Sequence, residues 1–180
     1  KTFIVEMDEV IHMIKIAWIA KQNLFFLGET GQAKSYTVQN FNKRIIGSNY
    51  MEVLMSKLMD DERIFGKLDL PKFKEGKVEI IIKNKLPDSD VVFLDEIFKS
   101  NDIVLNTLLK SMNYEEIDIE GNVFPPRHLT IFSASNELPN FKKEEDKILY
   151  PLYNRFHLKM RTENIKGKEN YKKVMRAKLA

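Results

Sequence analysis

The chain carries the stretch Gly28-Glu29-Thr30-Gly31-Gln32-Ala33-Lys34-Ser35 directly after the apolar run 24–27, and a helical pattern follows it. A strand, a glycine-containing loop and the start of a helix form the context that a phosphate-binding loop needs. Small residues let backbone N–H groups approach phosphate oxygens, and the helix N-terminus favours the same anion. These eight residues are therefore predicted to bind a nucleotide, with Lys34 on the β- and γ-phosphates and Ser35 on magnesium.

The loop departs from the common pattern G-x-x-x-x-G-K-[ST], known as Walker A, because Ala33 occupies the position of the second glycine. Alanine is the smallest replacement, but it resists positive φ. The loop is expected to work if Ala33 adopts ordinary helical backbone angles. The alternative is a turn before a helix that happens to contain Lys-Ser.

A second motif lies about sixty residues further on, where the apolar run 91–94 ends in Asp95 and Glu96. A continuous apolar run is typical of a strand buried on both faces of a parallel sheet, and ligands bind at the carboxyl ends of such strands. Asp95 is predicted to bind magnesium or its water, and Glu96 to orient and deprotonate the attacking water. A strand that ends in two solvated acids is the alternative. Together with the loop, this Walker B pattern predicts an ATPase that uses ATP and Mg²⁺.

Further apolar runs predict an α/β fold with a mostly parallel five-stranded sheet. Strands are expected at 24–27, 50–55, 91–94, 129–134 and 156–160, and helices at 8–21, from residue 34, from residue 101 and at 144–153. Alternation of this kind gives a three-layer αβα sandwich. Two β-hairpin inserts are predicted as well, one over 67–85 with a turn at 75–77, and one over 117–124 with its turn at 120–122.

Three segments carry a resemblance to a known family: Phe93-Leu94-Asp95-Glu96-Ile97-Phe98-Lys99, Leu105-Asn106-Thr107-Leu108-Leu109 and Ala134-Ser135-Asn136-Glu137-Leu138-Pro139. They resemble the MoxR family of AAA+ ATPases, and the RavA-like subgroup most. The Ala-Lys-Ser ending of the loop also occurs in that family. The resemblance implies the αβα core of a P-loop NTPase, without the small helical lid that carries the sensor 2 arginine.

The resemblance also implies two further catalytic residues. Asn136 matches the sensor 1 residue, which positions the lytic water, and it follows the predicted strand 129–134. Arg155 matches the arginine finger, which acts on ATP held by a neighbouring subunit. A turn asparagine and an ordinary arginine at a helix end are the alternatives.

The function predicted from these motifs is ATP binding and hydrolysis that drives chaperone-like remodelling of a protein client or assembly of a metal centre. The resemblance implies a ring, expected to be a hexamer, and a partner with a von Willebrand A-type domain. Two alternatives stay open: a nucleic-acid-dependent AAA+ motor, and an ATP-gated assembly module with little turnover.

Composition limits the other classes of function. The chain has 180 residues, 43% of them hydrophobic, no cysteine and a net charge of +3. Disulfides and thiolate metal sites are therefore excluded, and the charge is too small to argue for nucleic-acid binding. No signal peptide or membrane span is recognisable, which is compatible with a cytoplasmic protein. We expect a nucleotide-binding core at 1–162 and a basic helical segment at 163–180 that leads toward the missing lid.

Overall fold

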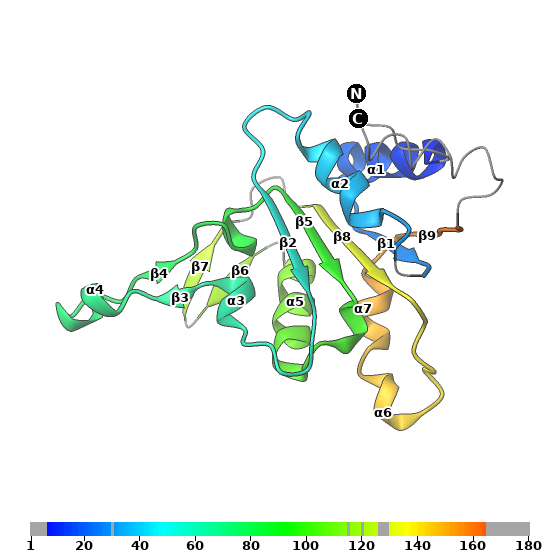
Figure 1. Ribbon diagram of the computed structural model, residues 1–180. Helices are drawn as coiled ribbons and strands as arrows, with labels where there is room; N and C mark the ends of the chain where they lie inside the picture. Colours follow the sequence, from blue (N-terminus) through cyan, green and yellow to red (C-terminus); the bar gives the residue numbers. More distant parts are fainter. Residues whose placement is uncertain (1–6, 30, 115, 120, 126–129, 165–180) are drawn as a thin grey trace.

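The computed structural model describes residues 7–29, 31–114, 116–119, 121–125 and 130–164. Five parallel strands form its central sheet in the order β2-β5-β8-β1-β9 (Figure 1). Because all five run in one direction, their carboxyl ends lie at one edge of the sheet. The predicted five-stranded parallel sheet is confirmed, with boundaries that shift by one or two residues. The strands are β1 (Leu24–Leu27), β2 (Tyr50–Leu54), β5 (Val91–Asp95), β8 (Thr130–Ser135) and β9 (Leu158–Arg161).

The two faces of the sheet bury separate apolar cores. On β5, Val92 and Leu94 belong to one core, and Val91 and Phe93 to the other. All four side chains are fully buried. Successive side chains of a strand point to opposite faces, so a strand covered on both sides must be apolar throughout.

Helices cover both faces and complete the predicted three layers (Figure 1). Helices α1 (Asp8–Ala20) and α2 (Lys34–Asn42) pack on the core that contains Val91. Helices α5 (Asp102–Tyr114) and α7 (Tyr150–Asn154) pack on the core that contains Val92. Shorter helical segments connect these layers: α3 (Glu62–Phe65), η1 (Leu86–Asp88), η2 (Ile97–Lys99) and α6 (Glu144–Lys147).

The residues that follow β2 and precede β5 in the sequence form an arm that projects from the sheet (Figure 1). Strands β3 (Lys67–Leu68) and β4 (Ile80–Ile81) pair antiparallel at its base, so the predicted pairing is confirmed. The prediction that a turn at 75–77 joins the two strands directly is wrong, because helix α4 (Leu70–Lys74) lies between them. The Asp69 side chain accepts a hydrogen bond from the Lys72 N–H and caps this helix.

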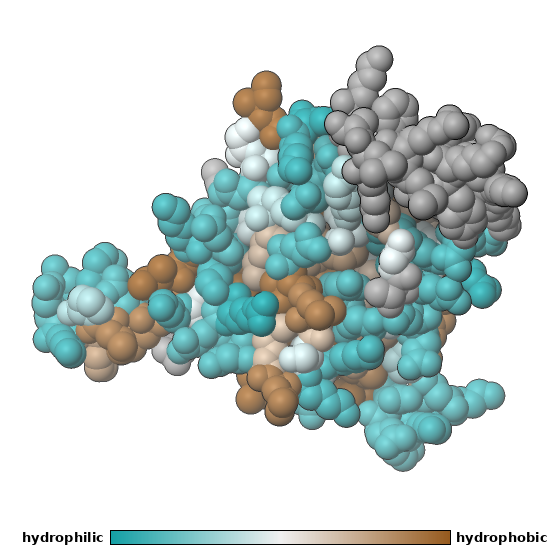
Figure 2. Space-filling view, in the orientation of Figure 1, coloured by the Kyte–Doolittle hydropathy of each residue, from teal (hydrophilic) through white to brown (hydrophobic). Residues whose placement is uncertain are grey.

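The surface of the arm mixes hydrophilic residues with exposed apolar ones (Figure 2). Leu70, Phe73 and Val78 are all more than half exposed. The second predicted hairpin is confirmed as β6 (Ile117–Ile119) and β7 (Asn122–Phe124). Within the described ranges, no helix combines the length and the apolar character that crossing a membrane requires.

Candidate functional site

The predicted phosphate loop connects the carboxyl end of β1 to the first turn of α2. Its expected strand–loop–helix context is therefore confirmed. Gly31 has a φ of +86°, which a glycine adopts without strain. Ser35 lies in the first turn of α2 and is half-buried. Thr30, the third residue of the predicted loop, lies outside the described residues.

Ala33 does not have the helical backbone angles that the sequence interpretation required. It has a φ of +54° and a ψ of +25°, which is the left-handed region. Its carbonyl accepts hydrogen bonds from the Thr37 N–H, at 2.9 Å, and from the Thr37 hydroxyl, at 2.8 Å. Ala33 thus adopts backbone angles that glycine adopts readily, although it carries a side chain.

Lys34 is buried, with 7% of the residue exposed. It donates hydrogen bonds to the carbonyls of Gly28, at 2.8 Å, and Glu29, at 2.7 Å. Burial lowers the pKa of Lys34, and the negative charges of Asp95 and Glu96 raise it in part. These electrostatic interactions mean that the two predicted acids lie close to the predicted phosphate-binding lysine.

Asp95 ends β5 and is partly buried. Burial is the largest influence on its carboxyl and raises its pKa, while the Glu96 N–H and the Lys34 ammonium oppose the rise. The Glu96 N–H donates to Asp95 Oδ1 at 3.0 Å, which orients the carboxylate. A partly buried acid within electrostatic reach of a buried lysine fits the electrostatic demands of a magnesium-phosphate site.

Glu96 has a φ of +53°, an uncommon conformation for a residue with a long side chain. Its Oε2 lies 3.4 Å from the Lys99 Nζ, and its side chain is 12% exposed whereas that of Lys99 is 62% exposed. Strained backbone of this kind gathers at functional sites, where the surrounding structure holds it. The sequence did not reveal that Lys99 pairs with this acid.

Strand register brings the three predicted segments to the same edge. Leu27 pairs with Ser135, and Leu94 pairs with Ser133. The Gly28 N–H also donates to the Ser135 carbonyl at 3.1 Å. Asn136 follows Ser135 directly and is exposed, so it lies at the carboxyl edge next to the phosphate loop. This is the position in which a sensor 1 residue was predicted.

Arg155 lies apart from this group. It is the C-terminal cap of α7, is exposed, and leads into β9. Among the described parts of the chain, it forms no salt bridge. The other predicted site residues of this chain lie at the ends of β1, β5 and β8. Arg155 could therefore contribute to such a site only in a different arrangement, for example in the site of a neighbouring subunit.

Sequence reasoning missed a polar network at the exit of β9. Thr162 and Asn164 follow this strand and hydrogen-bond to Gln32 and Glu29 of the loop. Gln32 and Thr162 are both buried, at 8% and 6% exposure. Buried polar side chains of this type need partners, but nothing in the sequence says that residues 130 positions apart provide them.

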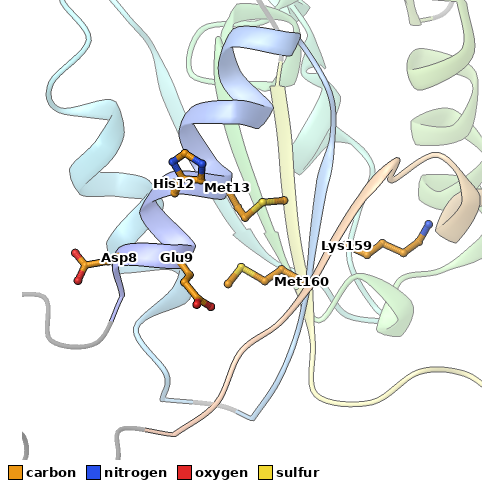
Figure 3. A pocket seen from close by; sticks show the side chains of 6 residues that line it. All are labelled: Asp8, Glu9, His12, Met13, Lys159 and Met160. Carbon is orange, nitrogen blue, oxygen red and sulfur yellow. The ribbon is translucent and has the colours of Figure 1, made fainter.

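A separate hollow of about 490 Å³ lies between the first turns of α1 and strand β9. Figure 3 shows the side chains of Met13 and Met160 in this space, whereas Asp8 and Lys159 point away from it. None of its lining residues belongs to the phosphate loop or to the acid pair. The chemistry predicted for the chain therefore concentrates at the loop, not in this hollow.

Comparison with known proteins agrees with this arrangement. A family model described as the MoxR domain in MoxR–vWA–β-propeller ternary systems matches residues 1–179. The chain belongs to the MoxR family. The family predicted from the three sequence segments is confirmed, and the RavA-like subgroup stays a prediction. This MoxR domain is an α/β protein with a parallel five-stranded central sheet.

Two similar proteins come from Methanocaldococcus jannaschii. The MoxR domain is 32% identical over 178 residues to the uncharacterized protein MJ0079, and 30% identical over 176 residues to the uncharacterized protein MJ0812. Each alignment covers 97% of this chain and 45% of the relative. The chain therefore spans less than half of the length of these curated relatives.

A solved structure from Cytophaga hutchinsonii, that of a proposed ATPase, has the same fold. The TM-score is 0.74 at 19% sequence identity, and the match covers 96% of this chain and 51% of the other. At this identity the similarity establishes the fold alone. The assignment of residues to roles rests on the geometry of this MoxR domain.

Proposed function

We propose that this MoxR domain binds ATP with Mg²⁺ and hydrolyses it, and that the reaction drives remodelling of a protein client. One observation carries the proposal: the buried Lys34 lies within electrostatic reach of Asp95 and Glu96. A lysine, a loop with left-handed backbone and two adjacent acids at one sheet edge suit a triphosphate and its metal.

The residues of the loop hold the phosphates. Backbone N–H groups of 28–34 approach the oxygens, and Lys34 exchanges its two carbonyl partners for the β- and γ-phosphates. Ser35 and Asp95 would hold Mg²⁺, directly or through its water. When bound, the metal would supply positive charge that neutralises the charge on the phosphate oxygens.

Glu96 then takes the proton from a water that attacks the γ-phosphate in line. Asn136, at the end of β8, hydrogen-bonds the same water and fixes its direction. The uncommon backbone conformation of Glu96, with a φ of +53°, supports this role, since strained backbone gathers at functional sites. The Lys99 Nζ, 3.4 Å from Glu96 Oε2, restrains the position of this carboxylate.

Arg155 completes the site of a neighbouring subunit. Its exposed position at the end of α7 supports this proposal, because the guanidinium is accessible to a second copy. The assembly we propose is a ring, expected to be a hexamer. The matched family model names a vWA domain and a β-propeller, so a protein of the vWA class is the proposed partner.

Nucleotide affinity and turnover test the proposal together. Calorimetry should detect MgATP binding to the wild type and none to Lys34→Ala, whose fold is checked by circular dichroism. Glu96→Gln should bind MgATP but hydrolyse it about 10²- to 10⁴-fold more slowly in single turnover. Wild-type affinity in a folded Lys34→Ala protein would remove the loop from the mechanism.

Two further outcomes separate the alternatives. Tight binding with negligible phosphate release by the assembled protein would favour an ATP-gated assembly module. Turnover that rises on addition of DNA, with a steep loss at higher salt, would favour a nucleic-acid-dependent motor. The proposed remodelling function predicts stimulation by the protein partner and not by DNA.

A further inference from the structure

The segment that leaves β9 is hydrogen-bonded to the phosphate loop. The Thr162 N–H donates to the Leu27 carbonyl at 2.8 Å, and the Thr162 hydroxyl donates to Gln32 Oε1. Gln32 Nε2 donates to Asn164 Oδ1 at 3.1 Å, and Asn164 Nδ2 donates to Glu29 Oε2 at 2.8 Å. The result is a continuous chain of side-chain hydrogen bonds from Thr162 to Glu29, which we call the exit network.

Close packing around Gly28 makes this network possible. A Cβ at position 28 would lie 2.1 Å from the Thr162 hydroxyl oxygen and 2.4 Å from Gln32 Oε1. Any other residue would therefore separate the loop from the exit of β9. Position 28 requires a glycine because there is no room for a side chain. Gly31, in contrast, is a glycine whose positive φ disfavours other residues.

The exit network holds the loop on both sides of Gly31. Glu29 and Gln32 lie on either side of Gly31, which is exposed, and a Cβ built at Gly31 would meet no atom within 4 Å. Among the described residues, Gly31 therefore has little packing that could define its conformation. Its conformation depends on the anchors at either side, and a buried amide such as that of Gln32 is costly to leave without partners.

We propose that Gln32, Thr162 and Asn164 are positioning residues that hold the phosphate loop in the conformation that binds a triphosphate. This inference rests on the proposed ATP-binding function of the loop. None of the three side chains needs to touch the nucleotide. They act through the backbone of 29–34, whose N–H groups must already point inward when the anion arrives.

Linkage follows from the same geometry. If the exit network favours the loop conformation that binds nucleotide, then bound nucleotide favours the exit network by the same factor. Nucleotide would thereby order residues 162–164, where the chain leaves the sheet. Nucleotide binding would therefore affect the conformation of the segment that follows β9.

A pair of isosteric substitutions tests the proposal. Thr162→Val removes the hydroxyl that donates to Gln32. Thr130→Val is the matched control, because Thr130 is fully buried in β8 and its hydroxyl has no hydrogen-bond partner within the described residues. Thr162→Ser restores the hydroxyl without the methyl group, and Asn164→Ala removes the exposed end of the network if Thr162→Val does not fold.

Two measurements are made on the same proteins: the affinity for a slowly hydrolysed MgATP analogue, and amide hydrogen exchange at 31–34 without nucleotide. Thr162→Val should bind about 3- to 10-fold more weakly, the loss expected for one hydrogen bond, and exchange faster at the loop. Asn164→Ala should shift both in the same direction. Thr162→Ser and Thr130→Val should behave like the wild type.

The proposal is overturned if Thr162→Val and Asn164→Ala match Thr130→Val in both affinity and loop exchange. A network that is only structural would lower thermal stability and leave the affinity of the folded protein unchanged, which also overturns it. Failure of the proposed function looks different. In that case the wild type binds no nucleotide, while faster loop exchange in Thr162→Val would still support positioning of the loop.

Discussion

Replacing Ala33 by glycine should stabilise the protein and keep nucleotide binding. Ala33 has a φ of +54°, in the left-handed region that costs a residue with a Cβ about 1–2 kcal/mol relative to glycine. Its side chain is exposed, so little packing is lost when the methyl group is removed. The Thr37 hydrogen bonds end on the Ala33 carbonyl, which glycine retains.

The expected gain is smaller than the strain alone. Glycine increases the conformational entropy of the unfolded chain, which opposes the substitution by about 0.4–1 kcal/mol. The net stabilisation should therefore be about 0.5–1 kcal/mol. For a protein of this size, that corresponds to a rise in Tm of about 1–4 °C.

Urea denaturation of Ala33→Gly, with two comparison variants, measures this gain. Ala20→Gly makes the same chemical change at an exposed position of α1 with right-handed helical backbone, and should destabilise by up to about 1 kcal/mol. Lys21→Gly relieves a left-handed residue, φ +52°, far from the loop and should stabilise. If Ala33→Gly destabilises as much as Ala20→Gly does, the assignment of strain at Ala33 is refuted.

Three further predictions concern the charges, the assembly and the packing of the site. Burial raises the pKa of Asp95, so the contribution of this carboxyl to stability is present below its unfolded pKa and is lost as pH rises through the folded pKa. In urea melts, Asp95→Asn should therefore be more stable than the wild type at pH 8 but not at pH 3. The same variant should lose the magnesium dependence of nucleotide binding. Arg155→Ala and Lys34→Ala subunits should each be inactive alone and regain phosphate release when mixed, since one donates the arginine and the other the intact pocket; mixed assemblies that form but stay inactive would contradict a shared site. Gly28→Ala should cost about 1–3 kcal/mol in urea denaturation, because its Cβ would lie 2.9 Å from the Thr162 carbonyl oxygen, which cannot rotate away; unchanged stability would contradict the close packing at the loop.

The sheet was predictable because its signal is local. The clearest signals come from β1 and from 91–94 of β5, which are short, wholly apolar runs with no polar residue to interrupt the pattern. The loop and acid pair were predictable for a similar reason, since the motifs are contiguous in sequence. Helix α4 was missed because Asp69 and Pro71 start a helix inside what appeared to be a hairpin.

The exit network could not be predicted from the sequence for a different reason. Thr162 and Gln32 are separated by 130 positions, and only the parallel pairing of β1 with β9 brings them together. Threonine and asparagine after a strand are common in turns, so their identity alone suggests nothing more. The left-handed backbone of Ala33 was also beyond sequence reasoning, since alanine rarely adopts it.

The distribution of strain supports the assignment of the site. Among the described residues, four that are not glycine have positive φ: Lys21, Ala33, Asn84 and Glu96. Lys21 caps the end of α1, and asparagine tolerates this conformation, so local structure explains the first and third. Ala33 and Glu96 have no such local reason, and they are the residues next to Lys34 and next to Asp95, the acid that we propose binds the metal.

The charged groups that burial disfavours lie next to the same strained residues. Burial disfavours the charged forms of both Lys34 and Asp95, although each partly compensates the other. A fold selected for stability alone would replace such a pair by apolar residues, which is often neutral or stabilising. Strained backbone and desolvated charge at the carboxyl edge of one sheet are costs that a bound magnesium triphosphate would offset, because its phosphates and metal carry charges opposite to those of Lys34 and Asp95.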